Sequence, residues 1–160
     1  MPHTELSLRA ITTDDALCIA SLWRVCTAEV AQHDAQFAPV LSDEIWAEKL
    51  SSALEQQQRF GWLLHNDTQI AAYVLCQWQQ GSPFFAPQLS LYISDLDVAP
   101  AFRGRRLTYQ LMQCVEHYAR EHQVFRVELS VALADPRPQQ VWAKHGFTPY
   151  LANLAKYLGS

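Results

Sequence analysis

The spacing of apolar residues changes period several times along the 160-residue chain, and each change predicts a different element. Over residues 19–30, 45–54 and 107–118, apolar side chains recur at helical intervals, so each segment is expected to bury one face of a helix. Thr13 is expected to cap the first of these helices and Ser42 to begin the second. A fourth helix is predicted from Asp135-Pro136 to Gly146, because Asp is a good N-cap, Pro suits a first turn and Gly commonly follows a last turn.

Strict alternation of apolar and polar residues predicts β-strands in the rest of the chain. Residues 60–64 and 70–78 alternate on either side of an Asn66-Asp67 turn, which is the pattern of a β-hairpin. The other predicted strands are 6–11, 88–98, 124–133 and one or two within 147–158. This order predicts an α/β (α+β) fold in a single domain over residues 1–160, with helices on both faces of one mixed, partly antiparallel, twisted sheet.

The strand predicted over 88–98 changes parity. Leu91 and Ile93 are apolar at odd positions, whereas Leu96 and Val98 are apolar at even positions. An extra residue near Ser94-Asp95, a β-bulge, would restore one apolar face and would leave backbone groups free for a ligand. The alternative is that both faces of this strand are buried, so that parity carries no information.

A basic loop follows this strand directly. Arg103, Arg105 and Arg106 surround Gly104, and a helix is expected to begin at Leu107-Thr108. A helix N-terminus offers unpaired N–H groups and a positive dipole end, and arginine binds phosphate oxygens with two donors. The loop therefore predicts a phosphate site, although it matches neither the Walker nor the dinucleotide-binding glycine pattern. The competing interpretation is a solvated basic turn.

Composition restricts the kind of ligand and the cellular setting. The formal net charge of −4 argues against a nucleic-acid partner and favours a small anionic ligand at this loop. No apolar run approaches the roughly 18 residues of a membrane span, and the first residues lack the apolar core of a signal peptide. The four cysteines are widely spaced without a metal-binding pattern, so we expect buried free thiols in a reducing cytoplasm and no metal site.

At this point the chain resembles the GNAT acetyltransferase family. The resemblance covers nearly the whole chain in element order and is sharpest from Asp95 to Phe147. Val98-Ala99-Pro100 followed by residues 103–108 is similar to the family's signature [Q/R]-x-x-G-x-[G/A], and Gly146-Phe147 is similar to its later G-F pair. The family also has a bulged strand that is splayed from its neighbour, in agreement with the parity break.

The resemblance implies an enzyme that moves acetyl from acetyl-CoA to a primary amine of a small molecule or protein, by direct attack on the thioester. A homodimer is compatible with it. The alternative is a non-catalytic acyl-CoA-binding regulatory protein on the same fold, because Arg106 and Thr108 replace the motif's glycines and Trp142 replaces a frequent acidic Tyr. We expect Arg106 to adopt helical backbone angles, so that the loop still forms.

The family comparison implies a set of cofactor-binding positions in this sequence. They are Leu96, Val98, Arg103, Gly104, Arg105, Arg106, Leu107, Thr108, Asp135 and Trp142. It also places the acceptor near His33-Asp34 and the Phe84-Phe85 loop.

The transfer itself needs a base, a hydrogen-bond donor that stabilises the oxyanion, and a thiolate that can leave. A lysine-like amine has a pKa of about 10.4, so a carboxylate that takes its proton is useful. Glu128, on the polar face of the strand at 124–133, and Asp97 are the leading candidates, with Asp95 and a water relay as alternatives. By resemblance, the backbone N–H of Val98 stabilises the oxyanion.

Overall fold

The structure is a computed structural model that describes residues 5–86 and 88–159. The predicted domain spans residues 1–160, and its residues 1–4, 87 and 160 lie outside the described residues. The described chain forms two compact units, one up to Ser130 and one from Val131 onward.

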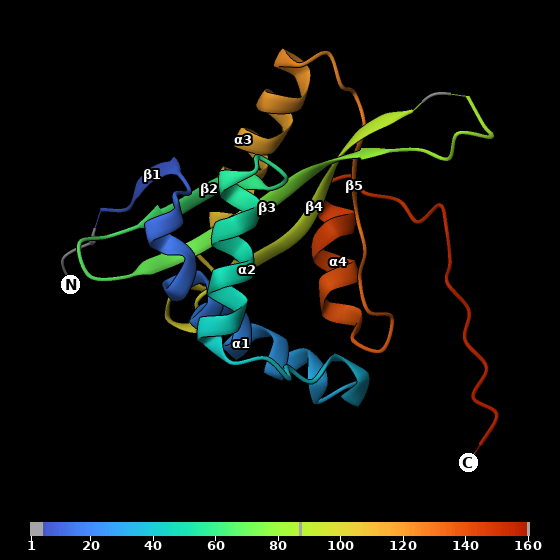
Figure 1. Cartoon of the computed structure of the whole chain (residues 1–160), viewed down its shortest axis with the longest axis horizontal. Coiled ribbons are helices and arrows are strands. Elements are labelled where there is room, and N and C mark those ends of the chain that lie inside the picture. The colour runs from blue at the N-terminus through green and yellow to red at the C-terminus, as the bar shows by residue number, and fades with distance from the viewer. Residues whose placement is uncertain (1–4, 87, 160) are drawn as a thin grey trace. The chain divides into compact units, whose positions relative to one another are not determined.

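The first unit holds the sheet and three of the α-helices (Figure 1). Its elements in chain order are β1 Ser7–Ala10, α1 Ala16–Ala31, α2 Asp43–Glu55, β2 Phe60–His65, β3 Ile70–Gln80, β4 Leu89–Val98, α3 Leu107–Glu121 and β5 Val127–Leu129. The second unit contains α4, Pro136–Lys144, after which Gly146 has a φ of +84°. The expected β-hairpin, with its turn at Asn66, and the four expected helices are confirmed.

The first helix begins one residue earlier than predicted. A short 3-10 helix, Thr13–Asp15, precedes α1, and its N-cap is Thr12 rather than Thr13. The Thr12 N–H donates to Asp15 Oδ2 at 2.8 Å, and the Asp15 carboxylate also accepts two hydrogen bonds from Arg9 of β1. The helix start is therefore capped by the local Thr12–Asp15 pair, and the ion pair with Arg9 joins this cap to β1.

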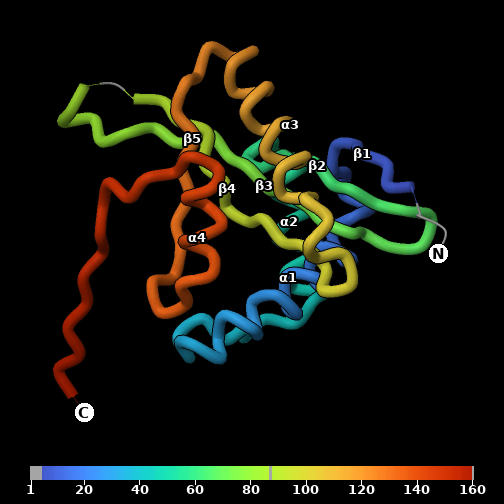
Figure 2. The backbone as a smooth tube through the Cα atoms, turned by 180° about the vertical axis from the view of Figure 1, so that it is seen from behind, coloured from blue at the N-terminus to red at the C-terminus, as the bar shows by residue number. Residues whose placement is uncertain are grey.

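The strands lie in the order β1-β2-β3-β4-β5. All neighbouring pairs are antiparallel except β4 and β5, which are parallel. The views from the two sides show α1 and α2 over one face of the sheet and α3 over the other (Figures 1 and 2). The predicted mixed sheet with helices on both faces is therefore confirmed.

Residues of β3 alternate between the two faces. Tyr73 and Leu75 pack with buried residues of α1 and α2, such as Ile19 and Leu50. Trp78 is on the opposite face of β3, where it lies against Tyr118 of α3 with ring centroids 5.9 Å apart. This parity decides which residues of β4 face α1 and α2.

The predicted bulge is present at Ser94. Asp95 pairs with Leu75, but Ile93 pairs with Cys76, so Ser94 has no counterpart in β3. Leu96 and Val98 consequently face α3 together with Leu91 and Ile93, while Asp95 and Asp97 face α1 and α2.

Two strand predictions are wrong in extent. The strand predicted over 124–133 is limited to Val127–Leu129, because Val124 donates its N–H to Ala119 at the end of α3, and β4 pairs with β5 only over Leu91–Ile93, before the bulge. No strand forms within 147–159 in the described residues. Apolar side chains in that segment are exposed, such as Leu154 at 95% exposure.

Candidate functional site

Beyond the bulge, β4 continues without a neighbour on its β5 side. The N–H of Ala99 donates to the carbonyl oxygen of Ala71 in β3, at 2.9 Å. Successive N–H groups along a strand point to alternate sides. The N–H groups of Val98 and Leu96 therefore point away from β3, toward the side on which Leu91 bonds to Arg126. No strand pairs with them there within residues 5–86 and 88–159, so two backbone donors are presented to a gap in the sheet.

Two carboxylates flank this gap on the α1 and α2 face. Asp97 accepts a hydrogen bond of 2.6 Å from the phenol of Tyr73, which lies opposite it on β3. The pKa of Asp97 is raised to about 7, chiefly by burial and also by the negative charge of Asp95, while the Tyr73 hydrogen bond opposes the shift. Burial also raises the pKa of Tyr73 well above its usual range, so Tyr73 remains a neutral donor. Asp97 can therefore take and release a proton near neutral pH.

Asp95 is the second carboxylate of this pair. Its Oδ2 lies 3.5 Å from Nη1 of Arg59, and a hydrogen bond joins it to Trp23 of α1. Burial raises the pKa of Asp95, whereas Ser94, Arg59 and Trp23 lower it. Arg59 was not singled out from the sequence, because its approach to Asp95 depends on the arrangement of three strands.

A buried thiol lies beside the same strand end. Cys26 Sγ is 3.9 Å from the carbonyl oxygen of Val98 and 3.9 Å from Nη2 of Arg103. Burial, together with the charge of Asp97, raises the pKa of Cys26 to about 12 despite Arg103. The side chain is thus a protonated thiol, which is a poor nucleophile. All four cysteines are free thiols, as expected, but only Cys26 and Cys76 are buried, whereas Cys114 is half-buried and Cys18 is exposed.

The arginine loop has a left-handed turn at its junction with α3. Gly104 has a φ of +78°, and Arg106, the N-cap of α3, has φ and ψ of +58° and +28°. The expectation of ordinary helical angles at Arg106 is wrong, since the turn into α3 requires the left-handed region. That conformation costs a non-glycine residue about 1–2 kcal/mol, and it explains why the family motif has a glycine at this position.

The three arginines of the loop differ in their surroundings. Arg103 pairs with Glu29 of α1 at 3.0 Å, and its Nε donates to the Val98 carbonyl at 3.3 Å. The Arg105 guanidinium lies 5.1 Å from the centre of the Phe102 ring. The side chains of Arg105 and Arg106 are both exposed at the start of α3. The loop therefore presents the cations Arg105 and Arg106 beside a helix N-terminus. Arg103 binds the loop to α1 through its ion pair with Glu29.

Replacing Arg106 with glycine should stabilise the protein. Glycine adopts the observed angles without strain but loses more freedom on folding, so we expect a net gain of roughly 0.5–1 kcal/mol in the free energy of unfolding. Chemical denaturation measures this change. Arg106→Ala is the matched control, because it removes the same charge and keeps the β-carbon. An equal gain for both variants would contradict the backbone explanation.

Glu128 lies in a hydrogen-bonded network at the edge of the sheet. Its carboxylate accepts from Ser90 at 2.8 Å, from Gln79 at 3.2 Å and from Arg126 at 2.6 Å, and the residue is buried. The polar face predicted for this strand is thus turned to polar partners on β3 and β4. Glu128 lies on the same face as Asp97 but near the opposite end of β4.

The remaining predicted site residues occupy other places. In the second unit, Asp135 caps α4 by accepting from the Arg137 N–H at 3.0 Å, and the ring of Trp142 lies edge-on to Phe147 at 5.3 Å. In the first unit, Asp34 caps a 3-10 helix after α1, and Phe84 and Phe85 are exposed between β3 and β4.

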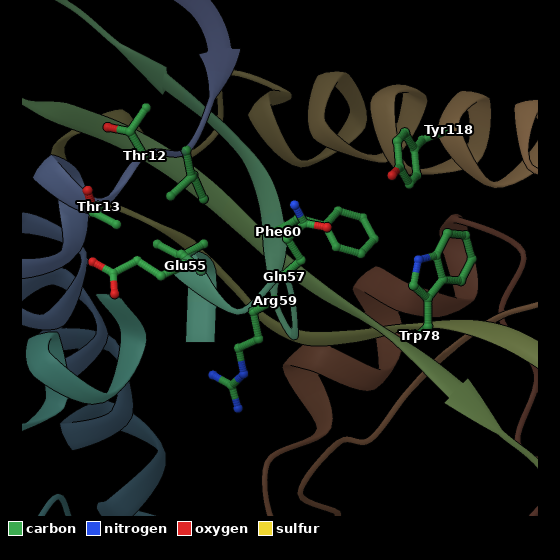
Figure 3. A pocket seen from close by; sticks show the side chains of 10 residues that line it. Thr12, Thr13, Glu55, Gln57, Arg59, Phe60, Trp78 and Tyr118 are labelled. Atoms are coloured by element: carbon green, nitrogen blue, oxygen red, sulfur yellow. The ribbon is translucent and has the colours of Figure 1, made fainter. Parts of the chain in front are cut away.

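Two cavities adjoin α2 and the start of β2. One of about 400 Å³ has Phe60, Trp78 and Tyr118 on one side and Thr13 and Glu55 on the other, while Arg59 extends away from the three rings (Figure 3). The second, of about 420 Å³, lies on the α2 face and is lined by Arg59 and Gln77 among others. Neither was predicted from the sequence, because each depends on packing between α2 and the sheet.

Two classes of site are missing from the described part of the chain. Within residues 5–86 and 88–159, no group of three or more His, Cys, Asp or Glu side chains is arranged to hold a metal ion. No helix in these ranges has the length and apolar composition needed to cross a membrane.

Comparison with known proteins identifies relatives of this arrangement. Residues 21–147 match the family model of the acetyltransferase (GNAT) family. No curated protein sequence matches the chain. Among solved structures, a tetramutant of the BH1408 protein from Bacillus halodurans is 19% identical with a TM-score of 0.85, and the match covers 95% of this chain and 99% of that one.

Two further solved structures share the fold. A predicted acetyltransferase with acetyl-CoA from Clostridium acetobutylicum is 16% identical with a TM-score of 0.75, over 96% of this chain and 97% of that one. A GCN5-related N-acetyltransferase from Ralstonia eutropha is 18% identical with a TM-score of 0.75, over 97% of this chain and all of that one. At these identities, the structures establish a common fold.

Proposed function

Because the chain belongs to the acetyltransferase (GNAT) family, we propose that it transfers the acetyl group of acetyl-CoA to a primary amine by direct attack on the thioester. The observation that carries this proposal is the position of Asp97. It is a carboxyl group with a pKa of about 7, beside two backbone donors that point into a gap in the sheet. Amine acylation requires a proton acceptor for the amine and a hydrogen-bond donor that stabilises the oxyanion.

In the proposed reaction, the ionised carboxylate of Asp97 takes a proton from the acceptor ammonium. The freed nitrogen lone pair forms a C–N bond with the thioester carbon, and the carbonyl π electrons move to oxygen. The Val98 N–H donates to that oxyanion, as an amide already aimed at the gap. The oxyanion then re-forms the carbonyl as the C–S bond breaks, and the excess proton on the attacking nitrogen passes to the departing thiolate, giving the amide and free CoA. Asp97 returns its proton to solvent.

Three side chains support Asp97 without touching the reacting atoms. Tyr73 orients the carboxylate through its hydrogen bond of 2.6 Å. Asp95 adds a negative charge that favours proton uptake by Asp97, and Cys26 packs against the Val98 carbonyl. The high pKa of Cys26, about 12, favours direct transfer over an acetyl-cysteine intermediate.

The arginine loop is the proposed site for the CoA phosphates. The first N–H groups of α3, together with Arg105 and Arg106, provide donors and positive charge, and Gly104 lets the backbone approach. Arg103 holds the loop on α1 through Glu29. Leu96 and Val98 offer backbone groups to the pantetheine chain, and Leu107 completes the proposed cofactor-binding set of the first unit. Asp135 and Trp142, in the second unit, stay predicted cofactor-binding residues.

Acetyl-CoA should raise the melting temperature. At a concentration of 100 times Kd, a ligand specific for the folded state adds about 2.7 kcal/mol, which is roughly 5–10 °C for a chain of this size. Differential scanning fluorimetry measures the shift. Acetylated pantetheine, which lacks the nucleotide and its phosphates, is the matched control and should give a much smaller shift. The absence of any shift at millimolar acetyl-CoA would contradict the proposed cofactor.

A second candidate is a non-catalytic acyl-CoA-binding protein on the same fold. The left-handed Arg106 and the tryptophan at position 142 favour it, because both depart from the family motif at its cofactor and acid positions. It predicts the thermal shift without release of CoA when amines are added. Turnover of any amine therefore separates the two candidates.

A further inference from the structure

The cavity of about 420 Å³ on the α2 face has an unusual charge distribution. Its charged lining residues are Lys49 and Arg59, and both are cations. Gln58 and Gln77 add amide donors, and Trp46 adds an aromatic wall. The neighbouring cavity differs, because Glu55 and Arg59 give its lining both signs of charge. The α2-face cavity therefore has the composition of a site for an anion.

Arg59 connects this cavity to Asp95 and, through the same strand, to the proposed base Asp97. Its guanidinium lines the cavity and lies 3.5 Å from Asp95. Asp97 is two residues further along β4, on the same face, at a spacing of roughly 7 Å along the strand. An aromatic surface follows the same direction, because Trp46 stacks on Trp23 at 5.3 Å and a hydrogen bond joins Trp23 to Asp95.

Lys49 is the cation of this cavity that is not paired with a carboxylate in the described part of the protein. Arg59 is shared with Asp95, whereas no carboxylate lies within 4 Å of Lys49 among the described residues. Lys49 is exposed on α2, so its ammonium is accessible to a ligand. A bound anion would complete the pairing of both cations.

We infer that the acceptor is an amine that also carries an anionic group, with the anion held by Lys49 and Arg59 and the amine directed to Asp97. This inference rests on the proposed function, and it specifies the substrate class of the same site. The spacing favours a linear acceptor in which several carbons separate the amine from a carboxylate. An ω-amino acid has this form.

Calorimetric titration of 6-aminohexanoate, compared with 6-aminohexanamide, in which a neutral amide replaces the carboxylate, tests the anion site without requiring turnover. We expect the acid to bind at least about tenfold more tightly than the amide, and the preference to weaken as salt is added. Lys49→Gln should reduce the preference severalfold, and Lys49→Arg should restore it. Glu48→Gln changes the net charge of the same helix away from the cavity and should leave the preference unchanged. Equal binding of acid and amide would overturn the inference.

CoA release with the same pair of compounds then separates this inference from the function on which it rests. A higher kcat/KM for the acid supports both. Turnover that favours the amide overturns the anion site and leaves the acetyltransferase in place. Selective binding of the acid with no turnover of any amine supports the anion site and contradicts the proposed function.

Discussion

Asp97→Asn is expected to lower kcat by roughly 10²–10³-fold, which is the usual contribution of a positioned general base. Asparagine has nearly the same shape and can still accept the hydrogen bond from Tyr73, so the fold and the cofactor site should be preserved. The expected loss therefore belongs to proton transfer. CoA release under saturating acetyl-CoA measures kcat, and the thermal shift with acetyl-CoA shows that the cofactor still binds.

The pH dependence adds a second readout to this variant. In the wild-type protein, kcat/KM should rise with pH through a midpoint of about 7, which follows the pKa of Asp97. Asp97→Asn should lose this inflection. Glu128→Gln is the matched control, because it removes the other candidate carboxylate, which accepts three hydrogen bonds. If Glu128→Gln lost the inflection and Asp97→Asn kept it, the base would be Glu128.

The same substitution should stabilise the protein at high pH. The fold raises the pKa of Asp97 from 3.8 to about 7, so the native state retains a proton that the unfolded state releases. Above pH 7 the ionised, partly buried carboxylate therefore disfavours folding, and this effect is lost as the pH falls toward 4. Asp97→Asn should melt at a higher temperature than wild type at pH 8, with a difference that disappears near pH 4. A group that improves activity and reduces stability in this way is typical of a functional site.

Gly61→Ala is expected to destabilise the protein by about 3 kcal/mol, the upper end of the range for overpacking. Gly61 is buried in β2, and an added β-carbon would lie 1.9 Å from the carbonyl oxygen of Val74 in β3. Backbone cannot move aside as a flexible side chain would, so β2 and β3 must separate. Thermal unfolding should show a decrease of roughly 6–12 °C.

Gly81→Ala is the control for this prediction. Its added β-carbon would meet its nearest neighbour, the carbonyl oxygen of Gln88, at 3.3 Å, which requires a shift of only tenths of an ångström. We expect a change several times smaller than that of Gly61→Ala. Similar losses in the two variants would show that contact with β3 does not explain the requirement for glycine at position 61.

Some features of the site could be predicted from the sequence because they depend on local periodicity. The bulge at Ser94 followed from the change of parity between Ile93 and Leu96, since a strand repeats every two residues. The helix that begins at Leu107 followed from its apolar spacing. Together they placed the arginine loop between a splayed strand and a helix N-terminus, which is the framework of the proposed cofactor site.

Other features depend on contacts between distant segments and were missed. The hydrogen bond between Tyr73 and Asp97 requires the register of β3 against β4, and the direction of Arg103 depends on Glu29, 74 residues earlier. The left-handed angles of Arg106 arise from the turn into α3, where glycine would have been the local signal. The segment after Gly146 alternates weakly, and no strand forms in its described residues.

The rate of CoA thiol release, measured as a function of pH, tests whether this protein acetylates an amine from acetyl-CoA with Asp97 as the base. A panel of primary amines, incubated with acetyl-CoA between pH 5 and 9, should include at least one that releases CoA at a rate rising through a midpoint of about 7 in the wild-type protein. Asp97→Asn should release CoA far more slowly. Binding of acetyl-CoA without release of CoA from any amine, or full activity in Asp97→Asn, would contradict this account.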